Sequence, residues 1–507
     1  MSIFLSKRRM FLVIMVIVLA MVLSACKKGS IPIFNMLSSE EDATRALKLA
    51  TYAPDTLNPL LTQNNSTAQM LNLAFEPLVW CDNSGNPLPI LAERWVVSDD
   101  NKTISIKLRE NVAMHDGNIM TQADVIYSLN LVRNNEKSVY HARLDNVENI
   151  SSIGSYEIKI TLKTPQPMFV NLLEIPIVKA NLKEQPLNPI GTGCYRYDNQ
   201  ATKKQISFVA FDSWWNADKP MISKVNFIIM DDIDAPLFAF DADEVDAISV
   251  DLANISKITT LDNATVVEVT TAKLAILGLN NSRSIFKSAE MRRALAFAIN
   301  KHKLVSDIFL ERAEVTSTFI NPLWSVYAPN LEYGFDTNIT RATLEHNVTG
   351  AFKILVNDSN DINVSAAQFI ANNLYDIGID AKVERVPIEA YNSRIQKGEY
   401  DAFLGNTMIA KDGNAQFLLA GEMSQFLKYD NAKMQERLVS WANQTTSEGQ
   451  ESGYYYIQKQ YLADMPFISL YFEDKVMAFS PDLVADGGFT PIEANVYYGI
   501  NKWSFGE

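Results

Sequence analysis

The chain has few of the side chains that build disulfide frameworks and metal sites. Its 507 residues contain three cysteines and four histidines. An exported location would allow a disulfide between Cys81 and Cys194, but their spacing indicates no disulfide framework, and two separate buried thiols are expected. Spacing typical of metal ligands is absent around each of the histidines, which are His115, His141, His302 and His346. The sequence therefore predicts no metal site.

Sequence motifs of catalysis are also missing. There is no Gly-x-Ser-x-Gly elbow, His-Glu-x-x-His, Cys-x-x-Cys or phosphate loop. The nearest glycine match, Gly191-Thr192-Gly193, lacks the third glycine and does not open a helix. Acidic residues are plentiful, but no carboxylate pair stands out. We therefore expect that the protein is not an enzyme and that it needs no cofactor. The alternative interpretation is a lipid-anchored hydrolase.

The chain also lacks an excess of positive charge. It holds 59 acidic and 45 basic residues, for a formal net charge of −14. Nucleic acid is not an expected partner, because phosphate binding needs clustered lysine and arginine.

Apolar residues make up 47% of the chain, which at this length supports two or three domain-sized cores.

One apolar run stands near the start of the chain. Met10 to Leu23 carry no charge and follow the basic residues Lys7, Arg8 and Arg9. A run of about fourteen residues is too short for a hydrocarbon core of ~30 Å, which needs roughly twenty. A basic start and a short apolar run are typical of a secretory signal, which we assign to residues 1–25.

The residues that end this run predict a lipid anchor. Leu23-Ser24-Ala25-Cys26 resembles a bacterial lipobox, in which the cysteine thiol takes the lipid. We therefore expect lipidation at Cys26 and attachment to the extracytoplasmic face of the cell membrane; the alternative is an ordinary signal with a chance cysteine. Residues 26–44 are polar and aperiodic, and they predict a flexible tether.

Several later segments have the periodicity of strands or helices. Alternation over 46–50, 104–108 and 158–162 predicts strands. Thr121, with Asp124 three residues later, is typical of a helix N-terminal cap. A second cap at Asn300 divides a pair of helices across 288–309.

The second half contains a strand–helix–strand pattern. Phe352 to Val356 predict a strand, and Ala366, Ile370 and Leu374 share one face of the helix after it. Gly378 stands where a helix C-terminus favours positive φ, and a strand returns at Ala381. Such a βαβ unit predicts locally parallel sheet.

A set of short motifs is spread over nearly the whole mature chain. The segments are Thr56-Leu57-Asn58-Pro59, Phe75-Glu76-Pro77, Leu91-Ala92-Glu93-Arg94-Trp95, Lys107-Leu108-Arg109-Glu110-Asn111-Val112, His115-Asp116-Gly117, Gly191-Thr192-Gly193-Cys194-Tyr195, Trp214-Trp215, Asp243-Glu244-Val245-Asp246-Ala247, Met291-Arg292-Arg293-Ala294-Leu295, Gly398-Glu399-Tyr400-Asp401 and Tyr461-Leu462-Ala463-Asp464-Met465-Pro466. Each motif is weak alone, and their order along the chain makes the set specific. Together they resemble extracellular solute-binding proteins of family 5, the oligopeptide-, dipeptide- and nickel-binding group of ABC importers.

The resemblance implies an α/β fold of two lobes, the type II periplasmic-binding-protein-like fold, with a third subdomain inserted in the N-terminal lobe. It divides the chain into three parts. Lobe I spans 45–75, 185–270 and 478–507. The inserted subdomain spans 76–184, and lobe II spans 271–477. The implied function is capture of a peptide or peptide-like solute between two closing lobes. The implied partners are an ABC permease with its ATPase subunits, and the protein is expected to be a monomer. A sensory lipoprotein that presents a signal peptide is the alternative.

One segment departs from the pattern of peptide-binding members, which resembles Gly-Trp-x-x-Asp-x-x-Asp-Pro and uses its first Asp to pair with the peptide amino terminus. When Gly405 is matched to the glycine, Asn406 takes the Trp position and Ile409 the position of the amine-pairing Asp. Asp412 then takes the second Asp position. A slip of one to three residues would instead bring Asp412 to the amine. Since a buried cation without its carboxylate is costly, we expect a modified peptide or another solute rather than a free-amine peptide held in the usual way.

The resemblance also implies which residues contact the solute. We expect Asn65 after the first strand, and Gly405, Asn406 and Thr407 on the facing lobe, to do so; for each, a plain loop or strand role is the alternative. Trp324 is interpreted either as a wall of the cleft or as a packed core residue.

Overall fold

The computed structural model describes residues 45–181, 189–199, 202, 204–250, 263–344 and 350–506. The described residues from Ala46 onward form one compact unit. The predicted signal, tether and lipidated Cys26 lie outside the described residues, as does the predicted boundary between residues 184 and 185. Among the described residues, no helix combines the length and the apolar character that a membrane crossing requires.

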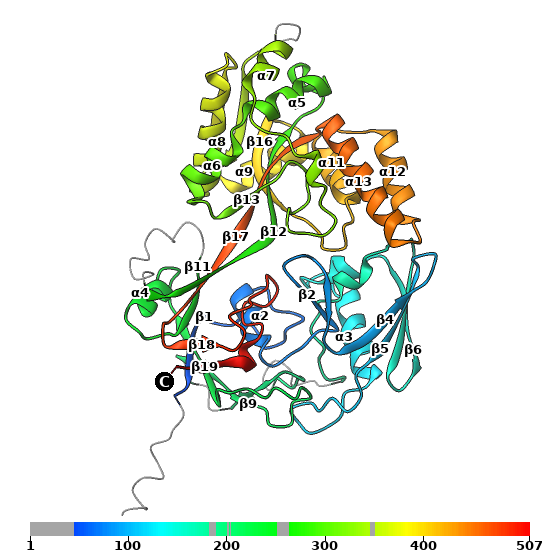
Figure 1. The fold of residues 1–507 in the computed structure, drawn as a ribbon, viewed down its shortest axis with the longest axis vertical. Coiled ribbons are helices and arrows are strands. Elements are labelled where there is room, and N and C mark those ends of the chain that lie inside the picture. The colour runs from blue at the N-terminus through cyan, green and yellow to red at the C-terminus, as the bar shows by residue number, and fades with distance from the viewer. Residues whose placement is uncertain are drawn as a thin grey trace, which may run out of the picture. The chain divides into compact units, whose positions relative to one another are not determined.

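An eleven-stranded mixed sheet runs through the compact unit (Figure 1). Its order is β15 (Ala381–Val386), β14 (Phe352–Asn357), β16 (Ala402–Met408), β12 (Thr265–Leu279), β17 (Phe467–Phe479), β11 (Ala247–Val250), β1 (Leu47–Tyr52), β10 (Lys224–Met230), β9 (Gln205–Ala210) and β8 (Tyr195–Asp198), with β13 (Ala313–Val315) paired to β17.

The long strands β12 and β17 are antiparallel and connect the two ends of this sheet. Their register runs from Thr265 opposite Phe479 to Gly278 opposite Phe467. It is irregular between Thr270 and Leu274, so the ladder is interrupted midway. A bulge of this kind bends and twists a strand locally.

The other strands of the described residues form smaller sheets. They are β4 (Ala92–Val97), β5 (Thr103–Leu108), β7 (Glu157–Leu162) and β6 (Val147–Gly154) in one antiparallel sheet, β2 (Val79–Cys81) with β3 (Pro87–Pro89), and β18 (Leu483–Ala485) with β19 (Trp503–Phe505).

The α-helices of the described residues surround these sheets. They are α2 (Asn65–Leu71), α3 (Gln122–Arg133), α4 (Ala235–Asp241), α5 (Ala289–Ala298), α6 (Lys301–Phe309), α7 (Thr337–Leu344), α8 (Asp361–Tyr375), α9 (Ile388–Lys397), α10 (Gln416–Leu419), α11 (Glu422–Phe426), α12 (Ala432–Ala442) and α13 (Ser447–Asp464).

The local sequence signals are confirmed. Thr121 and Asp124 form a capping box at the start of α3. Asn300 caps α6 by accepting from the backbone N–H of Lys303. Strands β14 and β15 are parallel and flank α8, as the βαβ pattern predicts, and Gly378 has φ of +90°.

Within the described ranges, the buried apolar residues form two large clusters and one small one. One large cluster draws on residues between 272 and 472, and the other on residues between 47 and 247 together with 477–503. The small cluster joins α4, β11 and the end of β17. Since β12 and β17 contribute to both ends of the sheet, they are the elements on which the two large cores meet.

Candidate functional site

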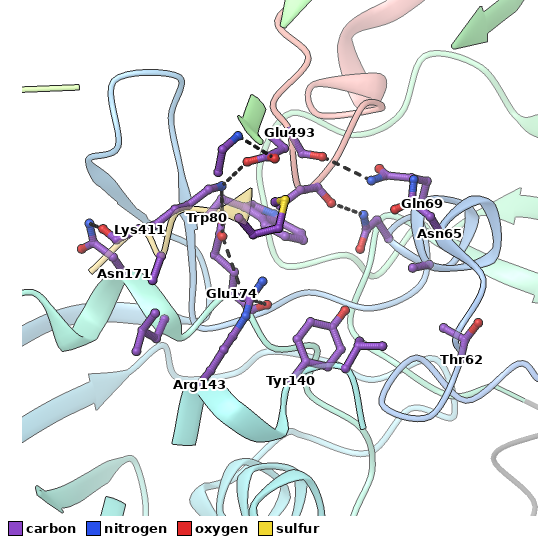
Figure 2. A pocket seen from close by; sticks show the side chains of 18 of the residues that line it. Thr62, Asn65, Gln69, Trp80, Tyr140, Arg143, Asn171, Glu174, Lys411 and Glu493 are labelled. Atoms are coloured by element: carbon purple, nitrogen blue, oxygen red, sulfur yellow. Dashed lines mark hydrogen bonds and ion pairs between the residues drawn. The ribbon is translucent and has the colours of Figure 1, made fainter. Parts of the chain in front are cut away.

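A cavity of about 520 Å³ opens beside helix α2. Figure 2 shows side chains from several distant segments pointing into it. Its lining residues are Thr62, Gln63, Asn64, Asn65, Ala68, Gln69, Asn72, Trp80, Val139, Tyr140, Arg143, Asn171, Leu172, Glu174, Ala272, Met408, Ile409, Ala410, Lys411, Lys475, Glu493 and Ala494. All three predicted parts of the chain therefore contribute to one cavity.

Helix α2 provides one wall. Asn64 caps it, with its side chain accepting from the backbone N–H groups of Ser66 and Thr67. Gln69 ties the helix to the C-terminal segment, because its Nε2 donates to the carbonyl of Glu493 at 3.3 Å and its Oε1 accepts from the N–H of Val496 at 2.9 Å. This wall is therefore fixed at its start and along its length.

Two short 3₁₀ helices of the predicted inserted subdomain provide the opposite wall. Arg143 belongs to the helix His141–Leu144, and its guanidinium lies over the ring of Tyr140, 5.1 Å from the centroid. Asn171 belongs to the helix Phe169–Leu172. Its Nδ2 donates to the carbonyl of Lys411 at 3.0 Å, and so fixes the chain that follows β16.

A lysine and two glutamates form an ionic cluster in this cavity (Figure 2). Lys411 Nζ lies 3.1 Å from Glu174 Oε2 and 3.6 Å from Glu493 Oε2. Glu174 also accepts from the backbone N–H of Cys81 at 2.8 Å, and Glu493 from that of Ala272 at 2.9 Å. Burial favours the neutral amine, but the two carboxylates outweigh it and raise the pKa of Lys411, which stays charged.

The cavity has a different charge balance from the chain. Its cationic side chains are Arg143, Lys411 and Lys475, and its acidic ones are Glu174 and Glu493, which gives a formal charge of 3 − 2 = +1. The whole chain carries −14. The arrangement holds polar groups at fixed places around a space the size of a small solute, as a binding site does.

Comparison with known proteins identifies the family. The model of bacterial extracellular solute-binding proteins, family 5 (middle), matches residues 86–421. The chain belongs to this family. The oligopeptide-binding protein AppA of Bacillus subtilis (strain 168) is 22% identical over an alignment of 542 positions that covers 98% of each chain.

Solved structures share the fold of this family 5 protein. The ABC transporter substrate-binding protein CtaP of Listeria monocytogenes gives a TM-score of 0.80 at 19% identity, covering 91% of this chain and 99% of CtaP. The AppA protein of Clostridium difficile gives 0.79 at 20% identity, covering 91% and 100%. The predicted family and the α/β type II periplasmic-binding-protein-like fold are confirmed. As a member of family 5, the chain is a solute-binding protein and not an enzyme.

The structure places the predicted contact residues unevenly. Asn65 lies after the first strand as expected and lines the cavity as the first residue of α2, because Asn64 caps the helix there. Gly405, Asn406 and Thr407 lie within β16 and outside the lining. β16 pairs with β12 through Met408, so the chain turns toward the cavity only from Met408 onward. Solute contact at these positions stays a prediction.

Asn406 and Gly405, which precede Thr407 in β16, contact side chains of the predicted lobe II. Asn406 donates to Glu473 Oε1 at 2.5 Å and accepts from Asn363 Nδ2 at 2.9 Å. Gly405 faces Tyr391, whose hydroxyl would lie 2.4 Å from an added Cβ. Contacts inside the protein therefore explain why these positions hold an asparagine and a glycine.

Asp412 and Trp324 lie outside the lining. Asp412 is buried, accepts from the N–H of Asn414 at 3.0 Å, and is hydrogen-bonded by Gln166. Burial raises the pKa of its carboxyl. Trp324 is 7% exposed and packs against Gly85, where an added Cβ would lie 3.3 Å from Cγ of the indole. Of the two interpretations of Trp324, the packed residue fits this position.

Sequence reasoning missed most of the charged lining. Ile409, at the register position of the amine-pairing Asp, does line the cavity, and Lys411 stands two residues beyond it. Arg143 and Glu174 carry no local motif. Groups of three or more His, Cys, Asp or Glu side chains suited to a metal do not occur in the part of the chain that the structure describes.

Proposed function

We propose that this family 5 protein captures a peptide or peptide-like solute in the cavity beside α2 and delivers it to an ABC permease with its ATPase subunits. The observation that carries the proposal is the cavity of about 520 Å³, which lobe I, the inserted subdomain and lobe II line together. The similarity to AppA of Bacillus subtilis, an oligopeptide-binding protein, supports a peptide-like solute. A solute that contacts lobe I, the inserted subdomain and lobe II would hold them together in a closed state. The permease would recognise this closed state.

The proposed lobes are 45–75 with 185–270 and 478–507 (lobe I), 76–184 (inserted subdomain) and 271–477 (lobe II). Strands β12 and β17 cross from lobe I to lobe II, and their interrupted ladder between Thr270 and Leu274 is the proposed hinge. When the strands bend at a place where the ladder is already irregular, few backbone hydrogen bonds between them have to break.

Solute retention tests the site. The protein is isolated from its native host, and small molecules released on unfolding are identified by mass spectrometry. Asn65→Trp places a large side chain in the cavity from an exposed helix start, and we expect loss of the solute. Asn338→Trp is the matched control, since Asn338 is an exposed residue in the first turn of α7 and away from the lining. Equal retention in both variants would place the solute elsewhere.

We further propose that a lipid on Cys26 holds the monomeric protein at the extracytoplasmic face of the cell membrane. One acyl chain binds a membrane only marginally, so stable attachment requires a diacyl modification at this cysteine. Cys26→Ser is expected to release the protein into the soluble fraction with solute retention unchanged, as measured by fractionation and mass spectrometry. Membrane retention of the variant would contradict the anchor.

A further inference from the structure

Lys411 places an ammonium group inside the proposed solute cavity. Its Nζ lies between two acidic side chains that come from separate parts of the chain, 3.1 Å from Glu174 Oε2 and 3.6 Å from Glu493 Oε2. Its side chain is 13% exposed, against 1% for Glu174 and 16% for Glu493. The cluster is therefore largely shielded from water and is fixed by ionic contacts.

Both carboxylates are already paired with Lys411. Among the described lining residues, Glu174 and Glu493 are the acidic ones. Glu174 Oε2 also lies 3.9 Å from Arg143 Nη1. Each carboxylate accepts one backbone N–H in addition to the lysine. A second ammonium entering the cavity would meet Lys411 at close range without a free carboxylate, and like charges in a poorly hydrated site repel strongly.

With Lys411 and Arg143 set against Glu174 and Glu493, the charge that remains among the lining residues is that of Lys475. The side chain of Lys475 makes no ion pair or hydrogen bond among the described residues, although it lines the cavity. Arg143 contacts the carbonyl of Glu174 at 3.1 Å, and its side chain is 33% exposed. Guanidinium and ammonium groups of this kind are suited to a carboxylate.

We propose that Lys411 is a built-in substitute for a solute amino group, so that the cavity selects peptide-like solutes that carry a carboxylate and have a blocked or missing α-amino group. The inference rests on the proposed function and names the solute class of the same site. In the bound state, Lys475 and Arg143 face the solute carboxylate, while Lys411 keeps Glu174 and Glu493 occupied.

Matched peptide libraries test this selection. Full-length protein, freed of retained solute, is mixed with tripeptides that have free amino termini and with the same tripeptides after N-acetylation. Bound peptides are separated by size and identified by mass spectrometry, and the best pair is then titrated by calorimetry. We expect the acetylated peptide to bind at least about tenfold more tightly than its free-amine counterpart, and conversion of its carboxylate to an amide to weaken binding at least about tenfold.

The variant Lys411→Met removes the internal ammonium and leaves the two carboxylates. We expect its preference to shift toward the free-amine peptide by at least about tenfold. Lys353→Met is the control, since Lys353 pairs with Glu384 at 3.2 Å on β14 and lies outside the cavity. Its preference should equal that of the wild type. Should Lys411→Met fail to fold, the comparison of libraries on the wild-type protein still decides the selection.

The outcomes separate the inference from the proposed function. Equal or tighter binding of free-amine peptides by the wild type would overturn the inference and leave solute capture standing. An unchanged preference in folded Lys411→Met would overturn the role of Lys411. Binding of neither library would contradict the capture of peptide-like solutes, and the inference with it.

Discussion

The carboxyl group of Glu76 is buried among three hydrogen-bond donors. It accepts from Trp214 Nε1 at 3.1 Å, Trp215 Nε1 at 2.8 Å and Thr192 Oγ1 at 2.8 Å. Burial raises its pKa to about 7, against the hydrogen bonds, which lower it. The Phe-Glu-Pro and Trp-Trp motifs that carried the family resemblance thus meet in one structural contact.

This contact predicts a pH dependence of stability. In the folded protein Glu76 holds its proton up to about pH 7, whereas the unfolded chain releases it near 4.5. The folded state therefore binds more protons between these values, and the contribution of Glu76 to stability falls as pH rises through this window. The Glu76→Gln variant has no titrating carboxyl group at this position. From about pH 5 to 7.5, the free energy of unfolding of the wild type should fall by roughly 1–3 kcal/mol relative to the variant.

Urea unfolding of both proteins over this pH range measures the difference. Glu76→Gln also weakens the contact itself, but that cost is common to every pH. A difference between the two proteins that stays constant from about pH 5 to 7.5 would contradict the raised pKa.

The thiols of Cys81 and Cys194 are both buried and free. Two separate buried thiols were the expected arrangement, and it is confirmed. Burial raises the pKa of both groups, so neither supplies the reactive thiolate at neutral pH. We expect iodoacetamide at about pH 8 to label both thiols much faster in urea than in the folded protein, as followed by mass spectrometry. Rapid labelling of either thiol in the folded protein would contradict this burial.

At the scale of elements, β16 shows how one glycine sets local packing. Tyr391 donates its hydroxyl proton to the carbonyl of Leu404 at 2.8 Å, across the face of Gly405. A Cβ at this position would lie 2.4 Å from that hydroxyl oxygen. Gly405 is therefore required by the contact between α9 and β16, independently of any solute.

The Gly405→Ala variant should lower the free energy of unfolding by about 1–3 kcal/mol, because the tyrosine must move out of a packed core. Adding Tyr391→Phe should recover part of the loss, since it removes the clashing oxygen. Gly334→Ala is the control, because nothing lies within 4 Å of its added Cβ. Urea unfolding measures all three variants, and an equal effect of both single alanine substitutions would rule out the steric explanation.

The sequence predicted elements better than it predicted the site. The cap of α3, the cap of α6 and the parallel pair β14 and β15 depend on residues close in sequence. The ionic cluster does not: Glu174 and Lys411 are 237 residues apart and are joined only by tertiary contacts. Periodicity carries no information on such pairs. The register placed Ile409 on the cavity, but it could not show that the strand residues before it are turned toward α9 and β17.

At the scale of the whole molecule, hydrogen bonds join residues 76–184 to residues 271–477, the proposed inserted subdomain and lobe II. Asn171 Nδ2 donates to the carbonyl of Lys411 at 3.0 Å, and Asn101 Nδ2 donates to that of Gln444 at 2.7 Å. A solute in the cavity adds further contacts across the same boundary. Solute binding is therefore expected to stabilise both large hydrophobic cores together.

Differential scanning calorimetry tests this coupling. A bound solute at 100 times its dissociation constant adds about 2.7 kcal/mol to the free energy of unfolding. We expect protein with its retained solute to unfold at a higher temperature than solute-free protein, with one shift common to the whole unfolding transition. Identical transitions, or a shift in only one part of a resolved double transition, would contradict a solute held between the lobes.

The cavity beside α2 is the proposed place of the solute. A crystal structure of the protein with its retained solute is the most direct measurement. It should show the solute between α2 and residues 408–411, with its carboxylate near Lys475 and Arg143 and with Lys411 still paired to Glu174 and Glu493. Solute density elsewhere, or a solute amino group bound to Glu174 in place of Lys411, would contradict the account.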